Sequence, residues 1–405
     1  MTVFEEEYAV AFFRAFQSLF RKQAPPALPG EGERPAYWDT LSVINDLSRL
    51  VRNDPEAVDI YLALGNLFRA QGDIERAVLI REGLIARPNL NTMFKARAYF
   101  ELGRDYHRAG VVDRSLAAFR EAARMGYSGD AVTAELAGVF ASSGDFERAA
   151  EEYGRLGHSL AQAHYLVRQA EELPKNAPKD QASKAEKLVK RALRIYTGSV
   201  EAWGASLHSA VKERSPKKIA LILERALSHI APRLRFLALD ALLEALPDAP
   251  PSADKMSRTG EGLAPANVTV QTGDDPENAL PFIRDVCAAV LPVLEKHEPH
   301  ILLHYYGAML LQRAGDMDAV EVWLAKALVV QPDFWAARLQ SLALSVEKHE
   351  LPPVVGMQIA YLTEELKYIK RFVCTVCGFR ENTVFYRCRR CGSWHSLAFR
   401  LSLQQ

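Results

Sequence analysis

The sequence has no long hydrophobic run. No stretch approaches the roughly 18 consecutive apolar residues that a membrane-spanning helix needs, and no secretory leader pattern opens the chain. An excess of charge is also missing, because 50 Lys and Arg balance 50 Asp and Glu. That balance removes any global signature of nucleic-acid or membrane binding. We therefore expect a folded cytoplasmic protein whose electrostatic partners, if any, are local.

Motifs of common catalytic sites are absent as well. The chain contains no P-loop, no Gly-x-Ser-x-Gly and no His-Glu-x-x-His. Cys287 stands alone in an apolar stretch with no histidine beside it, which is typical of a small buried hydrophobe rather than a nucleophile. The sequence therefore favours a protein that is not an enzyme.

Cysteine is scarce, and its placement is informative. Four of the five cysteines form two Cys-x-x-Cys-Gly knuckles near the C-terminus: Cys374, Cys377, Cys388 and Cys391. Each knuckle lets two thiolates of one turn face one metal, and the following glycine allows a positive φ. The pair predicts a closed site for one ion with four cysteine ligands, either iron or zinc. His395 could replace a ligand, but four thiolates already suffice, and disulfides are the less favoured alternative.

The tail around the knuckles is short and basic. Its large apolar residues Phe372, Phe379, Tyr386 and Trp394 are expected to form a small core around the metal. From residue 361 to 405 there are eight Lys and Arg against three Glu. Such a charge fits nucleic acid, acidic lipid head groups or an acidic protein face, although a solvated surface is the simplest interpretation of each arginine.

The middle of the chain repeats a Gly-Asp-x-x-x-Ala phrase. It recurs, with drift, near Gly72, Gly110, Gly144 and Gly315, and Gly110 and Gly144 are 34 residues apart. That spacing is the tetratricopeptide period. Because no single repeat buries its apolar face alone, the pattern predicts an all-α solenoid of stacked helix pairs, followed by a small rubredoxin-like or zinc-ribbon domain.

Residue sizes predict how each helix pair packs. Gly65 and Gly103 are small enough for the two helices of one unit to approach closely. The large residues of the repeats are expected to fill the space between units: Tyr61, Phe68, Tyr106 and Phe119. The aspartate of each Gly-Asp pair is placed to cap the second helix.

Composition divides the chain into six parts. Helical patterns of less regular repeats cover 185–196, 200–214, 217–230 and 280–296, and a loop is expected at 174–180. The predicted parts are an amphipathic N-terminal helix (1–24), a linker (25–37), tetratricopeptide repeats (38–245), a flexible Pro- and Gly-rich insert (246–278), C-terminal repeats with a lead-in helix (279–370) and a metal-binding domain (371–405). An aromatic stripe on 3–22 suits a membrane interface, a partner or the chain's own repeats.

Several stretches resemble one known family: 62–69, 72–77, 102–110, 374–379 and 388–394. They are similar to lipopolysaccharide assembly protein B, a family that joins tetratricopeptide repeats to a rubredoxin-like metal domain. The resemblance implies an adaptor at the cytoplasmic face of a Gram-negative inner membrane. Such proteins restrain lipopolysaccharide synthesis by promoting degradation of the deacetylase that commits to lipid A, through a membrane-anchored, ATP-dependent zinc protease. They also organise lipopolysaccharide assembly proteins, and their metal ligands correspond to the four tail cysteines.

The chain departs from this family in places. The family usually opens with a transmembrane helix, whereas Arg14 interrupts 3–22 here, and Arg389 stands where many members have proline. The resemblance also implies that the metal domain packs on the repeats, with a lead-in helix over 354–370. Two other functions stay open: electron transfer by an iron site with four cysteines, and nucleic-acid binding by a zinc ribbon on a repeat scaffold, the latter disfavoured by the balanced charge. A homodimer is also left open.

Overall fold

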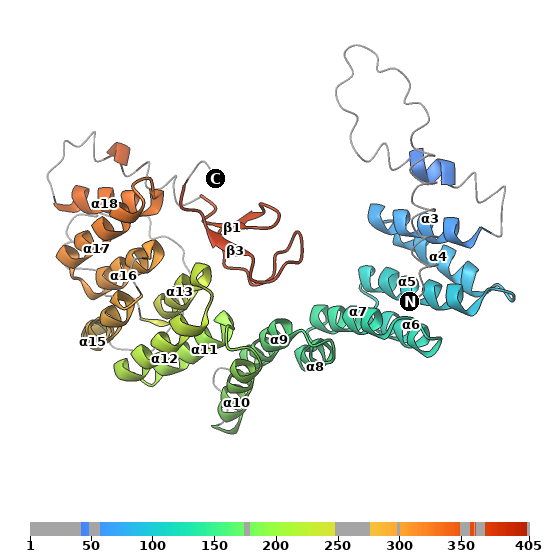
Figure 1. Ribbon diagram of the computed structural model, residues 1–405, viewed down its shortest axis with the longest axis horizontal. Helices are drawn as coiled ribbons and strands as arrows, with labels where there is room; N and C mark the ends of the chain where they lie inside the picture. The colour runs from blue at the N-terminus through green and yellow to red at the C-terminus, as the bar shows by residue number, and fades with distance from the viewer. Residues whose placement is uncertain are drawn as a thin grey trace, which may run out of the picture. The chain divides into compact units, whose positions relative to one another are not determined.

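The computed structural model is almost entirely helical (Figure 1). It describes residues 42–47, 57–173, 179–247, 276–297, 300–348, 357–359, 361 and 369–402. The amphipathic segment 1–24, the linker 25–37, most of the insert and most of the lead-in segment 354–370 lie outside these residues. No helix in the described ranges combines the length and apolar character needed to cross a membrane.

The chain divides into two compact units, Met1–Val132 and Thr133–Gln405, with the division inside helix α7 (Gly129–Ser142). In the first unit, residues 42–47 are helical. Two antiparallel helix pairs follow: α3 (Val58–Gln71) with α4 (Ile74–Ile85), and α5 (Thr92–Arg108) with α6 (Val112–Arg124). Each helix of this series packs on the next, as expected for stacked tetratricopeptide units.

The second unit continues with further packed helices (Figure 1). They are α8 (Phe146–Arg155), α9 (Ser159–Glu172), α10 (Lys179–Ile195), α11 (Val200–Lys212), α12 (Pro216–His229), the 3₁₀ turn η1 (Pro232–Leu234), α13 (Phe236–Ala245), α15 (Pro276–Glu295), α16 (Ile301–Ala314), α17 (Met317–Val330) and α18 (Trp335–Lys348). The helices predicted at 185–196, 200–214, 217–230 and 280–296 correspond to α10, α11, α12 and α15. Helix α10 begins at Lys179, so the loop expected at 174–180 ends earlier than predicted.

The repeated Gly-Asp pairs form turns between helices. Gly72, Gly144 and Gly315 all have φ between 80° and 85°, a left-handed conformation that is strained for residues with a Cβ. Asp73, Asp145 and Asp316 then cap α4, α8 and α17, each accepting a hydrogen bond from the backbone N–H three residues on. Asp113 is different, because it lies in the first turn of α6 and Val111 occupies the cap position.

The small residues allow close helix contacts, as predicted. A Cβ on Gly65 would lie 2.6 Å from the guanidinium carbon of Arg81, and a Cβ on Gly103 would lie 2.7 Å from the ring of Phe119. The expectation that Phe119 fills space between units is wrong, because its ring occupies the notch at Gly103 within its own helix pair. Tyr106 does bridge units, since its hydroxyl donates to Glu82 of α4 at 2.7 Å.

The C-terminal module is a small antiparallel sheet carrying two loops. Its strands β1 (Phe372–Cys374), β2 (Arg380–Glu381) and β3 (Leu397–Phe399) are ordered β2-β1-β3. Phe372 pairs with Glu381 on one side and with Phe399 on the other. The knuckles lie in the loops that follow β1 and precede β3, so the sheet brings them together.

This module shares its core with the repeats. One hydrophobic cluster joins Phe372, Phe385, Leu397 and Phe399 to residues of α11–α13 and α15–α18. The ring of Phe236 on α13 lies 6.2 Å from Phe372 and 5.9 Å from Phe399, between centroids. The module therefore packs on the second unit, as the family resemblance implied, and the small core expected around the cysteines is continuous with the core of the repeats.

Candidate metal centre

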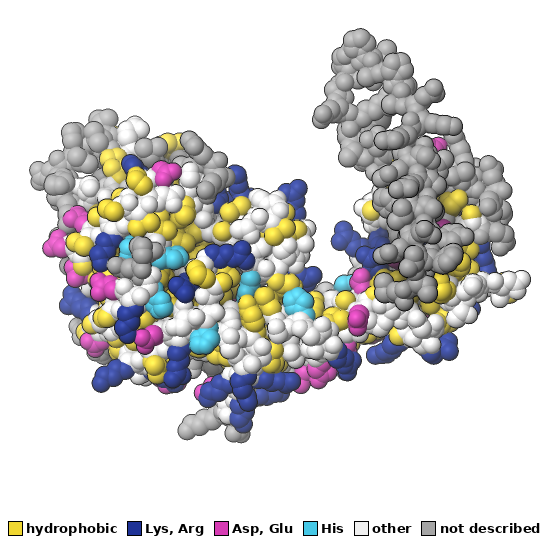
Figure 2. Space-filling model, in the orientation of Figure 1, with side chains coloured by type: hydrophobic (Ala, Val, Ile, Leu, Met, Phe, Trp, Pro, Cys, Tyr) yellow, Lys and Arg dark blue, Asp and Glu magenta, His cyan; other side chains and the backbone are white. Residues whose placement is uncertain are grey.

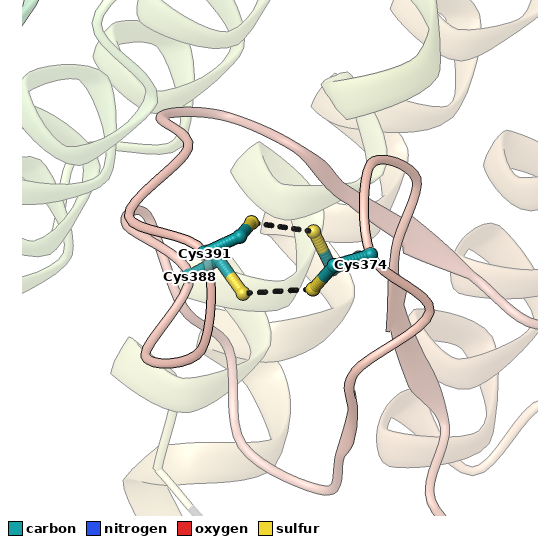
Figure 3. A group of neighbouring side chains, drawn as sticks. Cys374, Cys388 and Cys391 are labelled. Carbon is teal, nitrogen blue, oxygen red and sulfur yellow. Dashed lines mark hydrogen bonds between the residues drawn. The ribbon is translucent and has the colours of Figure 1, made fainter. Parts of the chain in front are cut away.

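The four tail cysteines converge on one point (Figure 3). All four sulfur atoms lie within 4.8 Å of one another. The Sγ atoms of Cys374 and Cys391 are 3.7 Å apart, and those of Cys377 and Cys388 are 3.6 Å apart. These distances are too long for disulfides, and all four residues are free cysteines. The two knuckles thus present one cluster of four sulfurs.

Each knuckle folds as its sequence predicts. Gly378 and Gly392 have φ of 70° and 72°, the left-handed conformation that glycine allows. Their backbone N–H groups donate to the carbonyls of Cys374 and Cys388, both at 2.9 Å, which closes each turn. The first cysteine of each knuckle, Cys374 or Cys388, is buried, whereas Cys391 is exposed.

Thiol acidity within the cluster is uneven. Burial opposes ionisation of Cys374, but hydrogen bonds from the Ser396 hydroxyl and from backbone amides lower its pKa to about 6. The Ser393 hydroxyl lowers the pKa of Cys391. For Cys377, a backbone hydrogen bond from Phe379 lowers the pKa, but burial and the hydrogen bonds shared with the neighbouring thiols outweigh it and raise the pKa. Two of the four thiols, Cys374 and Cys391, thus have hydrogen-bond partners that favour the negatively charged form.

The donor set fits a tetrahedral metal ion. Four thiolates at the usual zinc–sulfur distance of about 2.3 Å place neighbouring sulfurs about 3.8 Å apart. The observed 3.6 and 3.7 Å separations are close to that value. Soft thiolates suit both zinc and iron, and a cation would relieve the crowding of four acidic groups. Cys374, Cys377, Cys388 and Cys391 are the residues that would hold it.

His395 lies outside this donor set. Its Nε2 is 3.3 Å from a carboxylate oxygen of Glu201, at the N-terminus of α11. His164 of α9 reaches the same carboxylate at 3.0 Å. Glu201 is buried, yet the two imidazoles lower its pKa to about 2 in spite of that burial. Sequence reasoning missed this cluster, because its members are scattered along the chain.

Trp394 also faces the repeats rather than a core of its own. Its ring lies 6.0 Å from that of Tyr165 and 5.0 Å from that of His164, both on α9. Tyr153 of α8 stacks on Tyr165 at 5.3 Å, which extends the aromatic group. The second knuckle is therefore held against α8 and α9 by aromatic contacts.

The remaining cysteine behaves as predicted. Cys287 on α15 is buried, its thiol donates to the carbonyl of Leu310 at 3.4 Å, and burial raises its pKa to about 11. A thiol with that pKa is a poor nucleophile at neutral pH.

Fold and site together define a class of protein: a tetratricopeptide-repeat protein with a C-terminal module of four clustered cysteines. No family model matches the chain. Over 66 residues it is 38% identical to lipopolysaccharide assembly protein B of Escherichia coli K12, and equally to that of E. coli O157:H7. The aligned part covers 16% of this chain and 17% of each relative's length. The chain thus resembles lipopolysaccharide assembly protein B over a short segment.

Two tetratricopeptide proteins are among the solved structures to which the chain is similar. A tetratricopeptide repeat protein from Parabacteroides merdae covers 76% of this chain and 98% of its own, at 14% identity and a TM-score of 0.32. YrrB, a tetratricopeptide protein with an unusual peptide-binding site, covers 72% of this chain and 95% of its own, at 14% identity and a TM-score of 0.21.

Proposed function

We propose that this protein is a non-enzymatic adaptor in the control of lipopolysaccharide synthesis. Its partners would be a membrane-anchored, ATP-dependent protease, the deacetylase of the lipid A pathway and lipopolysaccharide assembly proteins. The local similarity to lipopolysaccharide assembly protein B supports the pathway. Stacked helix pairs support protein binding as the means, because such repeats build extended binding surfaces. We place the protein at the cytoplasmic face of the inner membrane.

The observation that carries the adaptor role is the shared core of the module and the repeats. Phe372 and Phe399 lie in the same hydrophobic cluster as Phe236 and Phe334 of the repeats, while Cys374 and Cys388 are buried beside them. Four thiolates leave no coordination position of a tetrahedral ion open, which is the pattern of structural sites. In this proposal the bound metal fastens the two knuckles, and the knuckles help to shape a surface that protein partners recognise.

A pull-down from the native host tests the proposal. The full chain carries an affinity tag and is compared with a Cys388→Ser variant, with metal content measured on both. We expect the protease and the deacetylase to co-purify with the full chain and to be depleted with the variant. Depletion of the protein from cells should also slow turnover of the deacetylase.

Two results would reject this function. One is recovery of neither the protease nor the deacetylase from membranes solubilised in mild detergent. The other is an unchanged half-life of the deacetylase in depleted cells. Catalysis of a reaction by the purified, metal-loaded chain would argue against the non-enzymatic part alone.

A further inference from the structure

Three exposed arginines surround the second knuckle. Arg389 and Arg390 are the two residues between Cys388 and Cys391, and Arg387 directly precedes them. Cys388, at the start of the knuckle, is only 2% exposed, whereas the arginines beside it and Cys391 at its end are exposed. On the face drawn in Figure 2, Lys and Arg side chains (dark blue) are scattered over the surface of the second unit.

Arg387 is fixed in place by its neighbours. Its guanidinium carbon lies 5.4 Å from the centre of the Trp394 ring, a cation–π distance. Its Nε donates to the carbonyl of Gly392 at 3.4 Å, so the side chain lies across the base of the knuckle. Trp394 is itself held by Tyr165 and His164 of α9. The guanidinium is thus oriented by the repeats as well as by the module.

The outward part of this guanidinium has no partner within the described residues. Its Nε makes the hydrogen bond to Gly392, and neither Nη group makes one. Because the guanidinium of Arg387 is already held in place, it loses little conformational entropy on binding. Its planar arrangement of N–H donors favours two parallel hydrogen bonds to a carboxylate.

Little negative charge offsets the arginines. Glu381 of β2 lies 3.9 Å from Arg389, at the limit of an ion pair, and the Arg389 side chain remains 74% exposed. Such a pair contributes little to stability. In the first knuckle, Val376 is 66% exposed. The second knuckle therefore presents exposed cations whose ion pairing within the fold is weak.

We propose that the second knuckle is a docking site for an acidic segment of a partner protein. In this proposal the guanidinium of Arg387 binds one carboxylate of the segment through two hydrogen bonds. Arg389 and Arg390, whose side chains are exposed, bind neighbouring carboxylates of the same segment. Arginine pairs with carboxylates through two parallel hydrogen bonds, which is a stronger and more specific contact than lysine makes. This inference names the partner chemistry of the proposed adaptor and rests on that function only in assigning a protein to the site.

Fluorescence anisotropy tests the site directly. The probe is a labelled peptide of ten glutamates, titrated with the full, metal-loaded chain at low and at physiological salt. We expect salt-dependent binding that the double variant Arg389→Glu/Arg390→Glu weakens at least about tenfold, because it replaces two attractive charges by two repulsive ones. Arg387→Lys keeps the charge and loses the fork, and should weaken binding several-fold.

A matched control separates this site from general charge. Lys217→Glu/Arg225→Glu makes the same change of charge on exposed residues of α12 and should leave peptide affinity unchanged. Metal content and circular dichroism confirm that each variant is folded. Equal weakening by the control variant, or equal affinity of the Arg387→Lys variant, would overturn the inference.

Two further outcomes would also overturn it. One is absence of peptide binding at low salt. The other is binding to vesicles containing phosphatidylglycerol, or to RNA, that is tighter than binding to the peptide and equally sensitive to the arginine changes. Loss of peptide binding with normal co-purification of the protease and deacetylase would reject this site and leave the adaptor function standing.

Discussion

His395 and Glu201 lie 194 positions apart in the sequence and meet at 3.3 Å between the imidazole Nε2 and a carboxylate oxygen. His395 belongs to the loop just before β3, has a φ of 45° and is buried. Its carbonyl accepts a hydrogen bond from Arg233 at 3.0 Å, so the same residue is held from two sides. The module is thereby joined to α11 and η1 by polar as well as apolar contacts.

Replacing the buried carboxylate should destabilise the second unit. Lowering the pKa of Glu201 from 4.5 to about 2 corresponds to about 3 kcal/mol of interaction favouring the charged form. Because its pKa is depressed, that contribution is present above pH 4.5 and is lost as the pH falls toward 2. Glu201→Gln should therefore cost about 2–3 kcal/mol at pH 7, measured by urea unfolding, and much less near pH 3.

The difference between the two proteins is the informative quantity, since metal release at acid pH affects both. A loss of stability that is the same at pH 7 and pH 3 would mean that the effect of the substitution is steric. The control is Glu213→Gln, which changes an exposed glutamate at the C-terminal end of the same helix, α11. It should change stability by less than about 1 kcal/mol.

Metal removal should act on one unit. Because Cys374 and Cys388 are buried in the core that the module shares with α11–α18, chelation or Cys388→Ser should raise hydrogen exchange in those helices. Helices α3–α6 have their own hydrophobic clusters and should keep their protection. Exchange measured by mass spectrometry on the full chain, with and without chelator, resolves the two regions, and uniform loss of protection would contradict this prediction.

The identity of the metal is a separate measurement. Iron in a site of four thiolates absorbs visible light and changes absorbance on reduction, whereas zinc is colourless and has no redox chemistry. A structural role predicts about one equivalent of metal per chain by elemental analysis and unchanged co-purification of partners when zinc replaces iron. Reversible bleaching, with partner binding that follows the redox state, would favour electron transfer.

The helix notches should not accept larger residues. Gly307→Ala on α16 would place a Cβ 2.5 Å from the ring of Trp323, so we expect about 1–3 kcal/mol of destabilisation from overpacking. Gly83→Ala on α4 is the matched control, because nothing lies within 4 Å of its added Cβ. That change should stabilise the protein by up to about 1 kcal/mol, since alanine is the better helix residue. Thermal unfolding of both variants tests the pair.

Two aligned aspartates should differ in importance. Asp145 accepts the hydrogen bond from the Arg148 N–H at 3.2 Å that caps α8, so Asp145→Ala should cost about 1 kcal/mol. Asp113 makes no such bond, because Val111 holds the cap position of α6, and Asp113→Ala should have a smaller effect. Equal losses in denaturant unfolding would show that capping does not distinguish the two repeats.

Local features of the sequence were good predictors. The knuckle glycines, the caps at Asp73 and Asp145 and the close contacts at Gly65 and Gly103 all follow from chemistry within a few residues or within one helix pair. The convergence of the four sulfurs was expected for the same reason, since two tight turns on one short sheet leave them few other arrangements.

Long-range features were beyond such reasoning. Neither the periodicity nor the composition relates Phe236 to Phe399, or Glu201 to His164 and His395. Phe119 shows the same limit at shorter range: its size indicated burial, but only the notch at Gly103 determines which neighbour it meets. Residues that pair across the second unit are ordinary in their own surroundings, and their roles become visible only when the chain is folded.

The shared core also sets an order of events in synthesis. In most repeat proteins each unit needs only its neighbours, so folding can follow the growing chain. Here Phe236 packs on Phe372, and Phe334 packs on Phe399. These contacts cannot form until the C-terminal module has been synthesised. Contacts between distant residues close slowly. Until the knuckles have been made, the helices of the second unit leave this apolar surface uncovered, and exposed apolar surface of this kind favours aggregation.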